Sequence, residues 1–224
     1  PIQIKPTVSR NVVFVPGHIW GENYDEWEAS LYDIKLKAKP VSGPAPADIM
    51  VIGKMPWVKE TEEGRNLIGD TGRIMIEACT RKFIKGLKKW YVTNLVKYMP
   101  PDDSTVLKSD WIKDCLPLLH EELRLVRPKF ILFLGADASK ELLGEKHTVT
   151  HMQGRVVPYT YPIHPSNELE AEYITAQCMT VLHPANVARA TGPHEARQLD
   201  VGIGRFGQLI NGVDLNQAET DLDH

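Results

Sequence analysis

The chain has 224 residues, of which 42% are hydrophobic and 25% are charged, and its formal net charge is −3. These values indicate one full-sized globular domain and exclude a nucleic-acid binder that depends on high overall positive charge. Because no apolar run approaches the ~20 residues of a membrane span and no apolar segment follows Lys5 and Arg10, we expect no membrane association and no secretion, with a place in the cytosol of a bacterium or of a virus-infected host.

The N-terminal stretch lacks a sustained hydrophobic period. Within it, residues 12–15 are a candidate edge strand, and residues 39–47 (KPVSGPAPA) have the composition of a linker. The acidic residues after Asn211 have the character of a terminal tail. We therefore expect an N-terminal extension and linker over residues 1–46, a folded domain over residues 47–211 and an acidic tail over residues 212–224.

Short apolar runs begin at residue 49 and alternate with helical patterns. Buried parallel strands are expected at residues 49–53 (IMVIG), 90–96 (WYVTNLV) and 130–135 (FILFLG), and two further strands at residues 155–157 and 179–182. The polar and aromatic segment between them, residues 158–178, is expected to be a loop or a short-helix insertion.

Helical periods separate these runs. The first helix is expected over about residues 71–87, capped by Asp70 or Thr71, with Ile76, Cys79 and Phe83 facing inward. A second helix is expected to begin at Ser109 and end before Pro128, with an inner face of Ile112, Cys115, Leu116, Leu119, Leu123 and Val126. Two more are expected at residues 136–144 and about 194–210, the last one weakened by Gly202, Gly204 and Gly207.

Strands that alternate with helices predict an α/β fold, a three-layer α/β/α sandwich around a mostly parallel central sheet. In such sheets, ligands bind beyond the carboxyl ends of the strands. Those ends are expected at residues 53–57, 93–101 and 182–186, which carry Asn, Lys, His and Pro. From the pattern alone, a ligand pocket and ordinary polar loops are about equally good interpretations.

Seven segments follow one another in an order and spacing that add to this interpretation. They are residues 53–57 (GKMPW), 64–72 (GRNLIGDTG), 93–101 (TNLVKYMPP), 115–117 (CLP), 128–138 (PKFILFLGADA), 154–155 (GR) and 180–185 (TVLHPA). In this order the chain resembles family 4 of the uracil-DNA glycosylase superfamily over roughly residues 47–211. The resemblance implies an enzyme scaffold that extrudes a nucleotide from DNA into a pocket, because the glycosidic bond is unreachable inside the duplex.

The resemblance also implies roles for single residues in the pocket. Asn94 would read the N3–H and O4 of uracil with its amide, and His183 would donate to O2 and stabilise the leaving base. Met55, Pro56 and Leu67 would surround the base, and Trp57 would help to shape the pocket. For Asn94 the alternative is an amide that caps a strand-to-loop turn, and for His183 it is a packed histidine before a proline turn.

DNA contacts are implied for the closing loop and for basic side chains. The loop from His183 to Arg189, which includes Pro184, Ala185 and Asn186, would enter the minor groove. Lys97 and Arg189 would contact phosphates. The lysines at positions 82, 85, 88 and 89 would join them, or they are a solvated helix end.

Three features depart from the family pattern. The glutamate that holds the attacking water is Lys54 here, and an ammonium cannot accept a proton from water. The carboxylates near it in sequence are Glu60, Glu62, Glu63 and Asp70. Of these, Asp70 is taken as the catalytic candidate, with a helix cap as its alternative role, while a neutral Lys54 acting as a nucleophile needs a large pKa depression. The stacking phenylalanine is Leu67, which offers no ring face.

The third departure concerns the iron–sulfur cluster that the family binds through four cysteines. One of those positions corresponds to Tyr98 and another to Cys115, and the chain has only two more cysteines, Cys79 and Cys178. One surviving ligand cannot hold a cluster. We therefore predict no cluster, no other metal and no cofactor.

Three functions follow from these observations. The first is a domain that binds single-stranded or uracil-containing DNA and accommodates a flipped base, with hydrolysis weakened or lost. The second is an active uracil-DNA glycosylase of base-excision repair, and the third is a protein–protein adaptor on the same scaffold. The proline-rich entry and acidic tail are compatible with a domain of a viral replication protein, with a DNA polymerase as partner in the same chain or separately.

Overall fold

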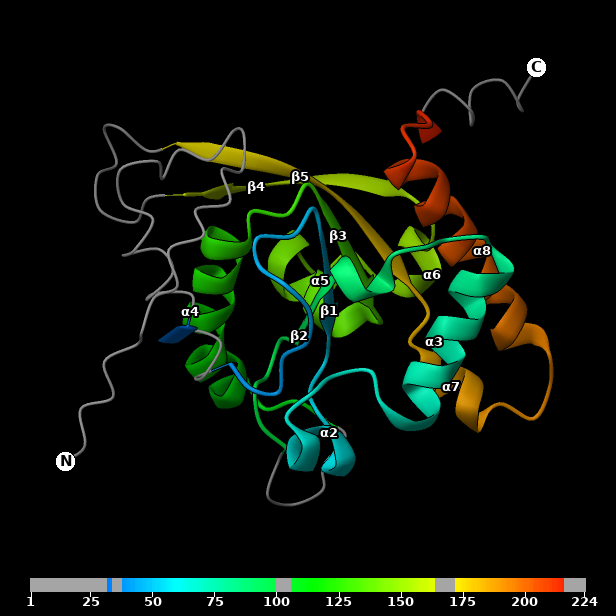
Figure 1. Cartoon of the computed structure of the whole chain (residues 1–224), viewed down its shortest axis with the longest axis horizontal. Helices are drawn as coiled ribbons and strands as arrows, with labels where there is room; N and C mark the ends of the chain where they lie inside the picture. The colour runs from blue at the N-terminus through cyan, green and yellow to red at the C-terminus, as the bar shows by residue number, and fades with distance from the viewer. Residues whose placement is uncertain (1–31, 34–37, 100–105, 164–171, 216–224) are drawn as a thin grey trace, which may run out of the picture.

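The computed structural model describes residues 32–33, 38–99, 106–163 and 172–215, and Figure 1 shows their arrangement. Five strands form one sheet in the order β2-β1-β3-β5-β4. The pairs β1–β2, β1–β3 and β3–β5 are parallel, and β4–β5 is antiparallel. The strands are β1 (Ile49–Gly53), β2 (Tyr91–Asn94), β3 (Phe130–Leu134), β4 (Val156–Pro162) and β5 (Tyr173–Val181).

Helices lie between the strands in sequence. They are α2 (Val58–Glu63), α3 (Gly69–Arg81), the 3-10 turn η1 (Leu87–Lys89), α4 (Ser109–Val126), α5 (Ala136–Leu143), α6 (Val149–Met152), α7 (Pro184–Arg189) and α8 (His194–Ile210). In the part of the chain that the structure describes, no helix has the length and apolar character to cross a membrane. The candidate strand at residues 12–15 and the tail beyond residue 215 lie outside the described residues.

Alternate residues of the strands face two separate cores, because successive side chains of a strand point to opposite faces. Val51 packs with α3 and α8, whereas its neighbours Met50 and Ile52 pack with α4. Figure 1 accordingly shows α3 and α8 on one side of the sheet and α4 on the other. The expected three-layer α/β/α sandwich around a mostly parallel sheet is confirmed.

Two details of the first predicted helix are wrong. Its N-cap residue is Ile68, without a side-chain bond, so neither Asp70 nor Thr71 caps it. The helix ends at Arg81, and Phe83 follows in the left-handed region with φ of 56° and 89% of its surface exposed. Ile76 of the predicted inward stripe is also 55% exposed, whereas Cys79 is buried as expected, together with Ile74, Met75 and Ala78.

The prediction of a loop or short helix over residues 158–178 is also wrong for its described part. Residues 156–162 and 173–181 form the antiparallel pair β4–β5. Tyr161 and Cys178 from this pair are buried in the second core. Pro158 and Pro162 obscured the strand pattern, but prolines are tolerated in β4 because it lies at the edge of the sheet.

The proline-rich segment before β1 packs against the other edge of the sheet. Ser42 forms two backbone hydrogen bonds with Val92 of β2, and Ala38, Pro40 and Ala47 are buried. This contact brings the carbonyl of Pro40 close to the end of β2, where the candidate site begins.

Candidate functional site

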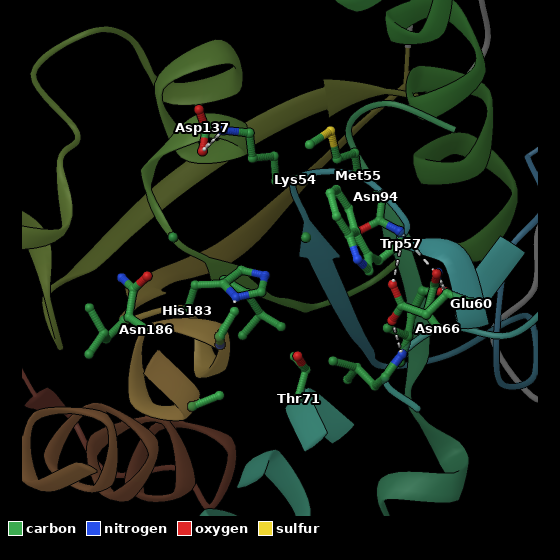
Figure 2. Close-up of a pocket in the computed structure, with 18 of the residues that line it drawn as sticks. Lys54, Met55, Trp57, Glu60, Asn66, Thr71, Asn94, Asp137, His183 and Asn186 are labelled. Atoms are coloured by element: carbon green, nitrogen blue, oxygen red, sulfur yellow. Dashed lines mark hydrogen bonds and ion pairs between the residues drawn. The ribbon is translucent and has the colours of Figure 1, made fainter. Parts of the chain in front are cut away.

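A cavity of about 720 Å³ lies beyond the carboxyl ends of the parallel strands. Gly53 ends β1, Asn94 ends β2 and Leu134 ends β3, and all three line the cavity together with His183, which follows β5. Parallel strands end at one edge of a sheet, which is why residues far apart in sequence meet here. Figure 2 shows Asn94 and His183 among the side chains around the cavity.

The structure brings most of the predicted site residues to this cavity. Nine line it, namely Lys54, Met55, Leu67, Asp70, Asn94, His183, Ala185, Asn186 and Arg189. Pro56 and Pro184 are buried beside these residues and are absent from the lining. They shape the loops that carry the lining residues.

The amide of Asn94 is buried and held in place by hydrogen bonds. Its Nδ2 donates to Oδ1 of Asn66 over 2.9 Å, and its backbone oxygen accepts from Nζ of Lys97 over 2.6 Å. Its Oδ1 lies over Gly53, where an added Cβ would be only 2.4 Å away. Gly53 therefore leaves the room that the Asn94 oxygen occupies at the mouth of the cavity.

His183 presents one ring nitrogen to the protein and leaves the other for a ligand. Its Nδ1 accepts a hydrogen bond from the backbone N–H of Ala185 over 3.1 Å, which places the proton of a neutral ring on Nε2. Burial, and then the charges of Arg189 and Lys54, lower the pKa of His183 to about 4, although Asp137 acts in the opposite direction. At neutral pH the ring is an uncharged donor.

Lys54 forms an ion pair that the sequence did not reveal. Its Nζ lies 3.5 Å from Oδ2 of Asp137, in the first turn of α5, and both side chains are partly exposed at the cavity. Figure 2 shows the pair at the cavity margin. A carboxylate thus stands beside the ammonium of Lys54 at the cavity.

Glu60 braces the loops below the cavity. Its two carboxylate oxygens accept from the backbone N–H of Trp57 over 3.1 Å and from that of Leu67 over 2.7 Å. Burial raises the pKa of Glu60, and these backbone donors oppose the rise. Because both carboxylate oxygens accept hydrogen bonds from the backbone of these loops, Glu60 has a structural role. Asp70 also lines the cavity, but its carboxylate is mostly exposed and lies 3.7 Å from Arg73.

The prediction that Lys97 contacts a DNA phosphate is wrong for this structure. The side chain is 4% exposed, and its Nζ donates to Thr93, to the backbone oxygen of Asn94 and to the carboxylate of Glu122. Tyr91 donates to the other oxygen of Glu122 over 2.8 Å. Lys97 therefore anchors the chain at Asn94. Its ammonium is buried and cannot reach a DNA phosphate.

The three cysteines do not fit an iron–sulfur cluster. Cys79 lies in the core under α3, and Cys178 lies in the core on the opposite face of the sheet. Sγ of Cys115 accepts from the backbone N–H of Lys97, and burial raises the pKa of its thiol. Among the described residues, no three His, Cys, Asp or Glu side chains converge on a metal position. The predicted absence of the cluster stays a prediction.

Two residues that contact the predicted site residues were not predicted from the sequence. Asp137 pairs with Lys54, and Asn66 holds the Asn94 amide. Trp57, which the sequence did indicate for the pocket, presents a half-exposed indole beside Asn94. No local signal marks Asp137 or Asn66, because their partners are distant in sequence.

Comparisons with known proteins follow the same segments. The family model of the uracil DNA glycosylase superfamily matches residues 40–200. The chain is 31% identical over 121 residues to a type-4 uracil-DNA glycosylase of Pyrobaculum aerophilum, covering 52% of this chain and 60% of that protein. It is 29% identical over 140 residues to the protein of the same name from Sulfurisphaera tokodaii, covering 60% of this chain and 62% of the relative.

A third relative, the type-4 uracil-DNA glycosylase of Saccharolobus solfataricus, is 27% identical over 129 residues, which cover 58% of this chain and 59% of that protein. The chain therefore spans about 60% of the length of these relatives. The matched residues include every strand of the sheet and both loops that carry Asn94 and His183.

Proposed function

Because the chain belongs to the uracil DNA glycosylase superfamily, with the pattern of family 4, we propose that its cavity receives a uracil extruded from DNA while hydrolysis of the glycosidic bond is weakened or lost. Two parts of the site bear on this proposal separately. The polar groups of Asn94 and His183 concern binding of the base, and Lys54 concerns the chemical step.

Binding of uracil is supported by the groups that the cavity presents. Asn94 offers a carbonyl oxygen and an N–H, which complement the N3–H and O4 of uracil. His183 offers its Nε2–H, which suits the O2 on which negative charge develops when the base departs. Trp57 supplies a ring face in a cavity where Leu67 replaces the family's phenylalanine.

The observation that carries the loss of hydrolysis is the ammonium of Lys54 at the cavity. It stands where the family has the glutamate that holds the attacking water. An ammonium only donates hydrogen bonds, so it cannot take a proton from water, and it repels the positive charge that develops on the sugar. Glu60 does not substitute, since its oxygens hold the backbone of Trp57 and Leu67.

Asp137 supports a second candidate, an active glycosylase. Its carboxylate lines the cavity 3.5 Å from Lys54 and is half exposed. In this candidate Asp137 orients the water in place of the missing glutamate, and Lys54 pairs with Asp137. The reaction would then be hydrolysis by water without a cofactor.

Contacts with the DNA strand are proposed for α7. Arg189 is exposed there, and its Nη2 donates to Oδ1 of Asn186 over 2.9 Å. Both side chains, with Ala185, lie between the cavity and solvent, where a strand that delivers the base would pass. Binding that relies on a few such cations weakens as salt concentration rises.

One experiment separates the two candidates. The protein is incubated with single-stranded DNA that carries one uracil, binding is measured by fluorescence anisotropy, and cleavage of the base is measured after alkali treatment. We expect binding without cleavage above background. Cleavage that disappears in Asp137→Asn, Asn94→Ala and His183→Ala variants would instead establish the second candidate.

The ion pair of Lys54 and Asp137 determines which variant tests the role of the missing carboxylate. A Lys54→Glu change alone would place two carboxylates side by side, where like charges oppose joint ionisation. We therefore expect the double variant Lys54→Glu, Asp137→Asn to gain at least roughly tenfold in cleavage, about 1.4 kcal/mol of transition-state stabilisation. The matched control is Lys54→Gln, Asp137→Asn, which removes the same charges and adds no carboxylate. Failure to bind uracil DNA at all would refute both candidates.

A further inference from the structure

Asn66 is a buried amide that lines the cavity. It occupies the loop between α2 and α3, and 6% of its surface is exposed. Its backbone N–H donates to Oγ of Ser42 over 2.8 Å. The residue is therefore held by the segment before β1 as well as by its own loop.

The orientation of the Asn66 side chain follows from its partners. Nδ2 donates to the backbone oxygen of Pro40 over 2.7 Å and to that of Val92 over 3.0 Å. Both partners are carbonyl oxygens, which only accept hydrogen bonds, so both N–H groups of the amide must point at them. Oδ1 of Asn66 consequently points the other way, towards Asn94.

The orientation of the Asn66 amide in turn fixes the orientation of the Asn94 amide. Its Nδ2 donates to Oδ1 of Asn66 over 2.9 Å (Figure 2). A rotation of the Asn94 amide by half a turn would bring two carbonyl oxygens together at this position and remove the hydrogen bond. Oδ1 of Asn94 is thereby kept over Gly53.

The two amide orientations suit different bases. Uracil has an N3–H donor next to the O4 acceptor, which matches the orientation present here. Cytosine has an N3 acceptor next to an amino donor, which needs the rotated amide. A freely rotating amide would serve both bases, whereas a fixed amide leaves buried polar groups unpaired when cytosine enters.

We propose that Asn66 is a specificity-determining residue, which holds the Asn94 amide in the orientation that accepts uracil and rejects cytosine. The proposal rests on the proposed function of the cavity and adds to it a positioning residue and the base that this residue excludes. Asn66 acts through Asn94 and through its tie to Pro40 and Val92.

The test compares binding of two bases in one sequence context. The probes are deoxyadenosine oligonucleotides with one central 2′-fluoro-deoxyuridine or 2′-fluoro-deoxycytidine, which resist hydrolysis, so that binding is read without cleavage. The ratio of the two Kd values is measured for the unmodified protein, for Asn66→Leu and for Asn211→Leu. Asn211 is the matched control because its Nδ2 donates to a backbone oxygen, that of Gly207, over 2.7 Å in α8.

We expect the unmodified protein to favour the uridine probe by roughly 100-fold or more, as sites built to pair with a polar group do. Asn66→Leu should lower this ratio by at least roughly tenfold, about 1.4 kcal/mol, and Asn211→Leu should leave it unchanged. A folded Asn66→Leu variant with an unchanged ratio overturns the role of Asn66 and leaves the proposed function intact. An unmodified protein that does not distinguish the probes refutes the proposed function itself.

A second measurement covers the case in which Asn66→Leu does not fold, since the change removes a hydrogen-bond donor from the carbonyl oxygens of Pro40 and Val92. In the unmodified protein, the side-chain N–H groups of Asn66 and Asn94 should exchange with solvent more slowly than that of the exposed Asn186, as followed by NMR. Asn66→Ser, which keeps one hydroxyl donor, should give an intermediate base ratio. Rapid exchange at Asn94 overturns the proposal.

Discussion

At the scale of the residue, His183 combines a fixed tautomer with a low pKa. The backbone N–H of Ala185 donates to Nδ1, which fixes the tautomer. Burial and the charges of Arg189 and Lys54 disfavour the imidazolium and lower the pKa. The result is a neutral Nε2–H donor aimed at the cavity. A neutral ring can donate to the O2 of a departing base without first losing a proton.

The pKa of His183 predicts how the protein responds to acid. The folded value of about 4 lies below the ordinary 6.5, so the unfolded chain binds the extra proton first as pH falls. The free energy of unfolding should therefore be fully retained above pH 6.5 and decline between pH 6.5 and 4. Because His183 stays neutral above its lowered pKa, the affinity for uracil should not change as the pH falls to about 5.

This prediction is checked by NMR titration of the His183 ring, assigned with a His183→Gln variant. The His183→Gln variant should also lose part of the stability decline between pH 6.5 and 4. A His183 resonance that titrates with a midpoint near 6.5 would contradict the environment described here.

At the scale of the element, the loop after β2 depends on a buried charge pair. Lys97 and Glu122 of α4 lie together in the interior, and burial lowers the pKa of Lys97 while Glu122 opposes that shift. We expect Lys97→Met to lower the free energy of unfolding by about 3–5 kcal/mol, because it leaves the Glu122 carboxylate buried without its partner. Urea denaturation measures the change.

Two variants make this prediction specific. The double variant Lys97→Met, Glu122→Gln should regain most of the loss, since no unpaired charge remains and Tyr91 can still donate to residue 122. Lys85→Met, at an exposed lysine, should change stability little. A small effect of Lys97→Met would show that the pair contributes little to holding the loop.

The end of β1 predicts a second effect at this scale. A Cβ at position 53 would lie 2.4 Å from Oδ1 of Asn94, so Gly53→Ala must displace the oxygen that we propose reads the base. Binding of a uracil-containing oligonucleotide should weaken by roughly tenfold or more, about 1.4 kcal/mol. Gly192→Ala is the matched control, since nothing lies within 4 Å of the added Cβ there. Equal affinity of the two variants would contradict a reading role for Asn94.

At the scale of the whole molecule, hydrogen bonds and a buried ion pair hold the segments around the cavity, and the absence of an iron–sulfur cluster is a prediction. The loop after β2 is held by Lys97 and Glu122, and the segment before β1 is joined to β2 through Ser42 and Asn66. These contacts brace the loops around the cavity without thiolate ligands. We expect iron and sulfide analysis of protein purified without oxygen to find neither in stoichiometric amount, and a full complement of four irons would overturn that expectation.

Much of this fold can be predicted from local sequence patterns. The apolar runs of β1 and β3 and the long period of α4 are readable because a strand or helix repeats its buried side over a few residues. Asn94 and His183 were predicted because their segments match the family pattern in order and spacing. The β4–β5 pair was missed because the prolines and polar alternation of an edge strand resemble a loop.

The sequence by itself thus determined the fold class and the loops that hold the site, since both depend on neighbours along the chain. Only the tertiary structure decided that Lys97 is buried on Glu122, that Asp137 pairs with Lys54, and that Asn66 orients Asn94. Those pairings join residues from separate elements, and an amide or an ammonium acquires its role from the partner that packing places within hydrogen-bonding distance.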